Sequence, residues 1–324
     1  MATQSEKSTT QVSDADPLAG MDADSIAYMA SQPPRASLLS ADEARENQRR
    51  TRPLEQPDLP HVAQVRELAA AGPAGPIPLR YYRPVGSAST DLLPAQIYYH
   101  GGGWVLGDLD SHDWICRAVA NAAQCAVVSV DYRLAPEHIF PAAFEDALAA
   151  AEWIAANANR LNIDPKRLSV GGDSSGGNLA AAVALALRER GTIKLRAQVL
   201  TYPAIDLTAH YDSRFASGIF LTNERMRDYI AIYAPDEARR KDWRCSPLLA
   251  SSLKGLPPAL FILAGFDPLY AEGAAYAERL KRDGVPVTVK TYPGQMHGFV
   301  SRPKLLPKAY DAVKDIAAAL KAQL

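Results

Sequence analysis

The chain has 324 residues, of which 48% are hydrophobic and 22% are charged, and this balance is typical of a globular protein with a large core. Its formal net charge is -1 at pH 7, and no block of Lys and Arg stands out, which argues against a nucleic-acid-binding protein. Three cysteines without metal-ligand spacing argue against a disulfide framework and against a metal site.

The N-terminal residues carry none of the usual targeting patterns. Residues 1–20 lack the apolar run of a signal peptide, and no long uncharged apolar run occurs elsewhere. We therefore expect a soluble cytoplasmic protein with no membrane partner. Residues 1 to about 16 are polar and rich in Ser, Thr and Gln, which predicts disorder.

Two short helices are predicted next. Ile26, Met29 and Ala30 suit one face of an amphipathic helix, and Ser40 with Glu43 forms a capping box for a helix through residue 50. Neither segment has enough apolar surface to stand alone. They are expected to lie on another part of the chain, as an N-terminal arm, as part of a lid or as structural packing.

From residue 62 onward the chain alternates between strand-like and helix-like patterns. Strands are predicted at 62–68, 77–82, 95–99, 126–130, 167–170, 195–202, 259–263 and 285–291, and helices at 111–123, 142–157, 179–187, 269–283 and 307–320. Gly and Pro breaks between the first three strands suggest an antiparallel edge. Helical crossovers between the later strands predict a mostly parallel, doubly wound sheet with helices on both faces.

One interval breaks this alternation. No convincing strand occurs at 206–252, but a helix is predicted at 222–234 with Thr222 as its cap. Insertions after the carboxyl end of a strand lie over the site in open α/β sheets, so the interval is a candidate cap. The alternative is an ordinary surface helix.

A nucleophile motif lies between a predicted strand and a helix. Gly172-Asp173-Ser174-Ser175-Gly176 matches G-x-S-x-G, in which a sharp turn raises a serine hydroxyl above the sheet. Glycines permit that turn because a Cβ would crowd the backbone. The alternative is a glycine-rich turn with an idle serine.

A glycine loop supports the catalytic interpretation. His100-Gly101-Gly102-Gly103-Trp104 directly follows a predicted strand, and three glycines leave backbone N–H groups open to a developing oxyanion. A phosphate-binding loop fits poorly, since G-x-G-x-x-G fails at Leu106. The predicted oxyanion donors are the N–H groups of Gly102, Gly103 and Ser175.

A serine nucleophile also needs a base and an acid from later strand ends. His297 follows the last predicted strand and is favoured over His210, which falls inside the candidate cap. Asp267 follows the strand next to it and is favoured over Asp206. The predicted catalytic residues are therefore Ser174, Asp267 and His297.

Five ordered motifs together resemble the hormone-sensitive-lipase family of α/β-hydrolase esterases, in its bacterial GDSAG branch. They are His100 to Trp104, Asp131 to His138, Gly172 to Gly177, Asp267-Pro268-Leu269 and His297-Gly298-Phe299. The resemblance runs from about Leu93 to the C-terminus. It implies the α/β-hydrolase fold with a helical cap and a serine carboxylesterase with this same triad and no cofactor. One departure is Ser175, where the family usually has Ala.

The same resemblance implies a division of the chain. Residues 1–55 form an N-terminal segment that contributes to the cap, residues 56–205 and 253–324 form the α/β-hydrolase core, and residues 206–252 form the cap insertion. No motif predicts a metal or a cofactor.

Apolar residues near the motifs suggest the substrate. The expected substrate-binding residues are Trp104, Val105, Phe215, Leu221, Phe266 and Met296. Because no charged cluster near them could bind a carboxylate, we expect a small-molecule partner: an uncharged ester of short to medium acyl chain. An amidase or lactonase would use the same triad, a non-catalytic receptor is disfavoured because His297 is present, and a homodimer is left open.

Overall fold

The computed structural model describes residues 18–31, 40–215 and 220–324. Within them, one sheet has eight strands in the order β1-β2-β4-β3-β5-β6-β7-β8. The strands are β1 Gln64–Gly72, β2 Gly75–Arg83, β3 Leu93–Tyr99, β4 Ala126–Val130, β5 Ile163–Asp173, β6 Ala197–Thr201, β7 Ala259–Phe266 and β8 Val287–Met296. Every predicted strand is present, so the mostly parallel α/β sheet is confirmed.

The antiparallel part of the sheet is confined to its first strands. β1 pairs antiparallel with β2, and β2 pairs antiparallel with β4. The prediction was wrong for the strand at 95–99, because β3 lies inside the sheet and pairs parallel with both β4 and β5. A helical crossover from β3 places β4 between β2 and β3, and such a crossover produces parallel neighbours.

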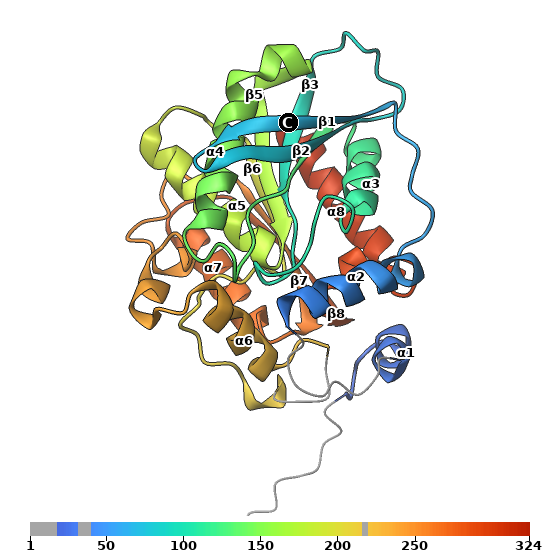
Figure 1. Cartoon of the computed structure of the whole chain (residues 1–324), viewed down its shortest axis with the longest axis vertical. Helices are drawn as coiled ribbons and strands as arrows, with labels where there is room; N and C mark the ends of the chain where they lie inside the picture. The colour runs from blue at the N-terminus through green and yellow to red at the C-terminus, as the bar shows by residue number, and fades with distance from the viewer. Residues whose placement is uncertain (1–17, 32–39, 216–219) are drawn as a thin grey trace, which may run out of the picture.

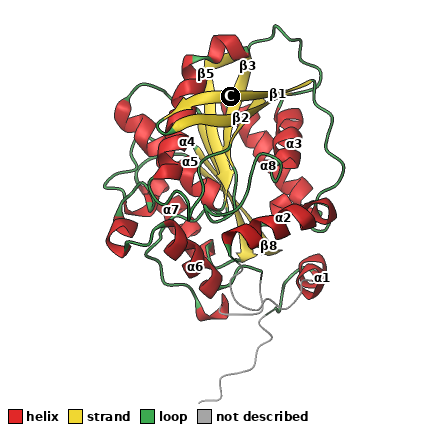
Figure 2. Cartoon of the chain, viewed as in Figure 1, coloured by secondary structure: helices red, strands yellow, loops and turns green. Residues whose placement is uncertain are grey.

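The eight α-helices of the described residues lie on both faces of this sheet and at one of its ends (Figures 1 and 2). They are α1 Ala23–Ser31, α2 Ala41–Glu55, α3 Asp113–Ala123, α4 Ala142–Ala156, α5 Ser175–Arg190, α6 Asn223–Tyr233, α7 Tyr270–Arg282 and α8 Lys308–Gln323. Short 3-10 turns complete the described part, at Ala158–Leu161, Ser213–Phe215, Glu237–Lys241, Pro247–Leu249 and Phe299–Ser301.

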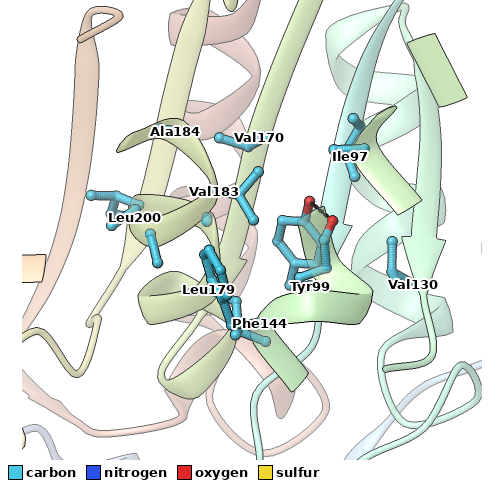
Figure 3. Packing of buried hydrophobic residues seen from close by; sticks show 14 of the residues in the cluster. Ile97, Tyr99, Val130, Phe144, Val170, Leu179, Val183, Ala184 and Leu200 are labelled. Atoms are coloured by element: carbon cyan, nitrogen blue, oxygen red, sulfur yellow. Dashed lines mark hydrogen bonds between the residues drawn. The ribbon is translucent and has the colours of Figure 1, made fainter. Parts of the chain in front are cut away.

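Alternation along the strands separates the core into two layers. Ile97 and Tyr99 of β3 pack into one buried cluster with α4, α5 and α7, while Tyr98 packs into the other with α3 and α8. Successive side chains of a strand point to opposite faces, so a strand covered on both sides is apolar throughout. Figure 3 shows Leu179 and Val183 of α5 packed among such strand side chains.

Helices α1, α2 and α6 lie together at one end of the sheet, below it in Figure 1. The predicted capping box of α2 is present, since Ser40 accepts from the N–H of Glu43 and the Glu43 carboxylate accepts in return. Thr222 caps α6 as predicted by accepting from the N–H of Arg225. The apolar face predicted for α1 was only partly right, because Met29 packs against the core but Ile26 is exposed and Tyr28 is the buried aromatic residue.

Two further expectations concern the N-terminal residues and membrane-spanning helices. The disorder predicted for residues 1 to about 16 falls outside the described residues. Among the helices that the structure does describe, none combines the length and the apolar character that crossing a membrane requires.

A glycine at the end of β5 tests how tightly this fold is packed. A Cβ added to Gly172 would overlap the backbone of Tyr99 and of Gly176, whereas a Cβ on Gly255 would meet only the Arg188 side chain at 3.9 Å. Gly255 has φ of +76°, so Gly255→Ala introduces backbone strain of about 1 to 2 kcal/mol and little else. We expect Gly172→Ala to lower the free energy of unfolding by at least about 2 kcal/mol more. Urea titration of both variants measures this, and equal losses would contradict it.

Candidate active site

Ser174 lies on a strained turn between β5 and α5. Its φ of 56° and ψ of -119° are unusual for a residue with a Cβ. The turn is held by two backbone hydrogen bonds, from the Ser174 N–H to the Thr201 carbonyl at 2.9 Å and from the Ala204 N–H to the Ser174 carbonyl at 3.3 Å. The hydroxyl is therefore raised above the carboxyl ends of the strands, as the motif predicts.

His297 lies between Ser174 and Asp267. Its Nε2 is 2.9 Å from the Ser174 Oγ, and its Nδ1 is 2.7 Å from the Asp267 Oδ2. An ionised carboxylate only accepts hydrogen bonds, so the imidazole proton lies on Nδ1 and Nε2 is free to accept from the serine hydroxyl. The structure thus brings together the three side chains that were predicted from the sequence to be catalytic.

Adjacent strands explain why Asp267 and His297 meet. Asp267 directly follows β7 and His297 directly follows β8, and these strands pair in parallel. Asp267 is fully buried, and its Oδ1 accepts from the N–H of Leu269 at 2.9 Å. The ring of Tyr202 packs against the His297 imidazole with centroids 4.7 Å apart. The carboxylate and the imidazole are therefore both fixed in orientation.

The glycine loop lies beside the serine. Gly102 and Gly103 have φ of +130° and +62°, and among the described residues their N–H groups donate to no other protein group. The Ser175 N–H begins α5, where the first N–H groups of a helix have no intrahelical partner. A Cβ on Gly103 would overlap the ring of Tyr229 from α6. Three N–H groups are therefore available near the Ser174 hydroxyl.

Asp173 anchors the start of the glycine loop. Its Oδ1 accepts from the Gly101 N–H at 2.9 Å and from the Tyr98 hydroxyl at 2.8 Å, and His112 Nε2 lies 3.2 Å away. Burial opposes ionisation, but His112 and Tyr98 outweigh it and lower the pKa of Asp173 to about 2. The contacts of Asp173 with Tyr98 and His112 were not predicted from the sequence.

Helix α2 reaches this network through a chain of polar contacts. Arg52 Nη2 donates to both carboxylate oxygens of Asp108, at 3.0 and 2.9 Å, and Asp108 Oδ1 accepts from the Ser111 N–H at 2.6 Å. The Ser111 hydroxyl lies 2.8 Å from His112 Nδ1. The N-terminal helix is thereby connected to the carboxylate that precedes the serine.

The two rival residues, His210 and Asp206, and two further ionisable residues near the site have other contacts. His210 is exposed, and the Asp206 carboxylate accepts from the N–H and the hydroxyl of Thr208. Burial raises the pKa of the Glu272 carboxyl well above its usual range, and this carboxyl accepts from the Ile205 N–H at 2.6 Å. Burial lowers the pKa of His100 to about 4, so its neutral ring orders the loop by donating to the Gly101 carbonyl.

A cavity of about 140 Å³ opens onto Ser174 and His297. Helix α2 contributes Asn47, Gln48, Thr51 and Glu55 to its wall. These residues were not predicted from the sequence, because a polar helix face that lines a cavity resembles a solvated one. Their spacing on one face of a helix was the available signal. A larger cavity of about 430 Å³ beyond Gly107 does not include Ser174.

Of the six predicted substrate-binding residues, only Leu221 lines this cavity. Trp104 is fully buried and stacks on Tyr233 with ring centroids 4.5 Å apart. The other four also lie outside the cavity wall: Val105, Phe215 and Met296 are buried, and Phe266 is half-buried. Nearness in sequence to a motif was a poor guide, because apolar side chains next to a strand end turn into the core.

Within the described residues, no group of three His, Cys, Asp or Glu side chains could hold a metal ion. The free cysteines Cys116, Cys125 and Cys245 are all buried.

Comparisons with known proteins agree with this geometry. A family model described as the alpha/beta hydrolase fold matches residues 96–301. Carboxylic ester hydrolase LipN of Mycobacterium tuberculosis is 43% identical over 272 residues, which cover 82% of this chain and 71% of the relative. Ethyl acetate hydrolase of Pseudomonas putida is 39% identical over 251 residues, which cover 76% of this chain and 79% of the relative.

A solved structure shows the same similarity over nearly the whole chain. Ester-hydrolase EH1AB1 from the metagenome of Lake Arreo, complexed with a derivative of bipyridine phosphonate, is 41% identical and superposes with a TM-score of 0.87. The match covers 93% of this chain and 98% of that structure's chain.

The low pKa of Asp173 has a consequence for acid stability. A carboxyl whose folded pKa lies below its unfolded value stabilises the fold above the unfolded pKa, and this stabilisation is lost as pH falls through the folded pKa of about 2. We expect the free energy of unfolding of Asp173→Asn to fall by about 2 kcal/mol less than that of the natural protein between pH 5 and pH 2. Urea titrations across this range measure the difference, and parallel curves would contradict it.

Proposed function

Because the chain belongs to the α/β-hydrolase family, in the esterase branch that resembles hormone-sensitive lipase, and hydrolyses carboxylic esters, we propose that Ser174 carries the acyl group in this reaction. The observation that carries the proposal is the position of His297, hydrogen-bonded at once to the Ser174 hydroxyl and to the buried Asp267. This arrangement supports the roles of nucleophile, base and acid.

In the proposed first half-reaction, the Ser174 Oγ attacks the ester carbonyl carbon while His297 Nε2 takes its proton. Asp267 holds the imidazole in the required tautomer and stabilises the imidazolium. The oxyanion accepts hydrogen bonds from the N–H groups of Gly102, Gly103 and Ser175, which need no reorganisation. The imidazolium then protonates the leaving alcohol, and Ser174 keeps the acyl group.

In the second half-reaction, water replaces the alcohol. His297 removes a proton from the water as it attacks the acyl-enzyme, and the same N–H groups stabilise the second oxyanion. His297 then returns the proton to Ser174 Oγ as the carboxylic acid leaves. One ester and one water become one acid and one alcohol.

We also propose that residues up to 55 and residues 206–252 form a cap over the core. The support is that α2 and α6 both contribute side chains to the wall of the cavity at Ser174, and both helices lie at the same end of the sheet (Figure 1). Under this proposal, residues 56–205 and 253–324 supply the catalytic groups and the cap sets the space for the substrate. A homodimer and a cytoplasmic location stay predictions.

The proposed substrates are esters of short to medium acyl chain. The cavity volume of about 140 Å³ is below the range of about 300 to 1,000 Å³ in which drug-sized ligands bind. The name of the ethyl acetate hydrolase relative points to the same size class. No feature of the site favours an amide or a lactone over an ester, so the ester remains the proposal.

Substitution of the proposed catalytic residues tests the mechanism. We expect Ser174→Ala and His297→Ala to lower kcat for p-nitrophenyl butyrate by about 10⁶-fold, because each removes a group that acts as part of one unit. Asp267→Asn should lower kcat by about 10⁴-fold, because the amide favours the wrong tautomer. Asp206→Asn is the matched control and should leave kcat within about twofold. Full activity of Ser174→Ala would refute the mechanism.

A series of p-nitrophenyl esters tests the size of the acyl group. We expect kcat/KM to be highest between acetate and hexanoate and to fall beyond octanoate, because the cavity of about 140 Å³ leaves little room for a longer chain. Steady-state rates below the critical micelle concentration of each ester provide the measurement. An optimum at laurate or palmitate would refute the proposed size class.

A further inference from the structure

Arg225 places an unpaired positive charge at the proposed active site. Its side chain, on the first turn of α6, lines the same cavity as Ser174 and His297. Among the described residues, no carboxylate comes within ion-pair distance of this guanidinium and its side chain donates no hydrogen bond to another protein group. Glu224 and Asp228 lie on the same helix; Asp228 is near enough to interact electrostatically with Arg225, but neither carboxylate forms an ion pair with it. Within the described part of the chain, the side-chain donors of Arg225 therefore have no hydrogen-bond partner.

The other cation of the cavity wall is satisfied. Arg302 donates to the Gly298 carbonyl at 2.7 Å and to the Tyr28 hydroxyl at 2.9 Å, and it pairs with the Glu55 carboxylate at 3.4 Å. Glu55 thus balances Arg302 and leaves nothing for Arg225. Asp173, also on this wall, is held by the Gly101 N–H, the Tyr98 hydroxyl and His112. Of the two guanidinium groups of the wall, that of Arg225 is the one without a carboxylate partner among the described residues.

Two aromatic rings fix Arg225 relative to the reacting groups. Its guanidinium lies 5.7 Å from the centroid of Phe220 and 5.9 Å from that of Tyr229, which is within the range of cation–π attraction. Tyr229 packs directly on Gly103 of the glycine loop. Because these rings already restrict the guanidinium, the Arg225 side chain loses little further conformational entropy when a ligand binds, and its charge is held near the loop.

Phe220 connects the same charge to the other side of the site. Its ring also lies 4.4 Å from the Arg302 guanidinium, and it approaches Gly298, the residue after His297, since a Cβ there would be 3.6 Å from the Phe220 Cε1. Arg225 is therefore separated by one aromatic ring from the glycine loop and by one from the His297 turn. A group bound to it would lie in the same cavity as an ester carbonyl at Ser174.

We propose that Arg225 forms an anion subsite and that the enzyme prefers esters that carry a carboxylate on their acyl or alcohol side. A carboxylate matches the planar donor edge of a guanidinium, and the resulting bonds are charge-assisted. This inference rests on the proposed esterase function of Ser174. It revises the expectation of uncharged substrates, which was made because the sequence shows no charged cluster near the motifs; the fold instead brings the single guanidinium of Arg225 to the cavity by placing α6 over the glycine loop.

Matched ester pairs test the subsite and identify which side of the ester carries the carboxylate. On the acyl side, monomethyl adipate is compared with methyl hexanoate. On the alcohol side, 3-(4-acetoxyphenyl)propanoic acid is compared with its primary amide. In each pair the measured quantity is the ratio of kcat/KM for the charged ester to that for the neutral one, and this ratio cancels general effects of a substitution on folding or chemistry.

Arg225→Gln removes the charge while keeping most of the side-chain length. We expect it to lower the ratio by about tenfold to a hundredfold in at least one pair, which is the effect of losing a charge-assisted hydrogen bond. Arg227→Gln is the matched control, since Arg227 lies on the same helix, is exposed and does not line the cavity. The control should leave both ratios unchanged, and raised salt should lower the ratio of the natural protein more than that of Arg225→Gln.

The outcomes separate this inference from the proposed function. If the natural protein hydrolyses the neutral esters but Arg225→Gln leaves both ratios within about twofold, the subsite is refuted and the esterase proposal stands. An equal fall of the ratio in Arg227→Gln would also refute the subsite, because it would show a general effect of surface charge. If the natural protein hydrolyses neither member of any pair, the proposed function fails first.

Discussion

The close approach of the first turn of α5 to the end of β3 is the constraint on which the site depends. Gly172 and Gly176 both lie against the carbonyl of Tyr99, where no Cβ would fit. This approach forces Ser174 into its positive φ and brings the glycine loop, which begins after Tyr99, beside the serine hydroxyl. The hydrogen bond from the Gly101 N–H to Asp173 then fixes the loop. The backbone strain at Ser174 persists because packing on both sides leaves no alternative.

Two buried carboxyl groups near this turn have different surroundings, and their pKa values are shifted in opposite directions. Asp173 has His112, Tyr98 and a backbone N–H as partners, so its pKa lies well below the usual range. Glu272 is buried without a cation, and its pKa is raised well above the usual range. Both tie loops together near the carboxyl ends of the strands. The difference follows from the rule that a buried charge is tolerated only where hydrogen bonds or opposite charges compensate its desolvation.

The cavity wall is built from segments that are far apart in the chain. Arg302, shortly after His297, is half-buried against Tyr28 of α1 and Glu55 of α2, with the Phe220 ring 4.4 Å from its guanidinium. These contacts hold the N-terminal helices against the turn that carries the imidazole. The same arrangement uses the charge of Arg302 internally and leaves that of Arg225 facing the cavity, so charge balance inside the wall decides which polar group is open to a ligand.

What the sequence determined by itself is local or follows from strand order. The motif around Ser174, the glycines before Trp104, and the positions of Asp267 and His297 after successive strands were readable because each is tied to a strand end, and parallel strands end at one edge. The sheet and most helices could be predicted from apolar periodicity, which is also a local property of the sequence. Only the tertiary structure decided the substrate wall. Trp104 and Met296 turned inward to the core, while polar residues of α2 and Arg225 of α6 faced the cavity. A polar helix face has the same pattern whether it meets water or a substrate, and only packing between distant segments distinguishes the two.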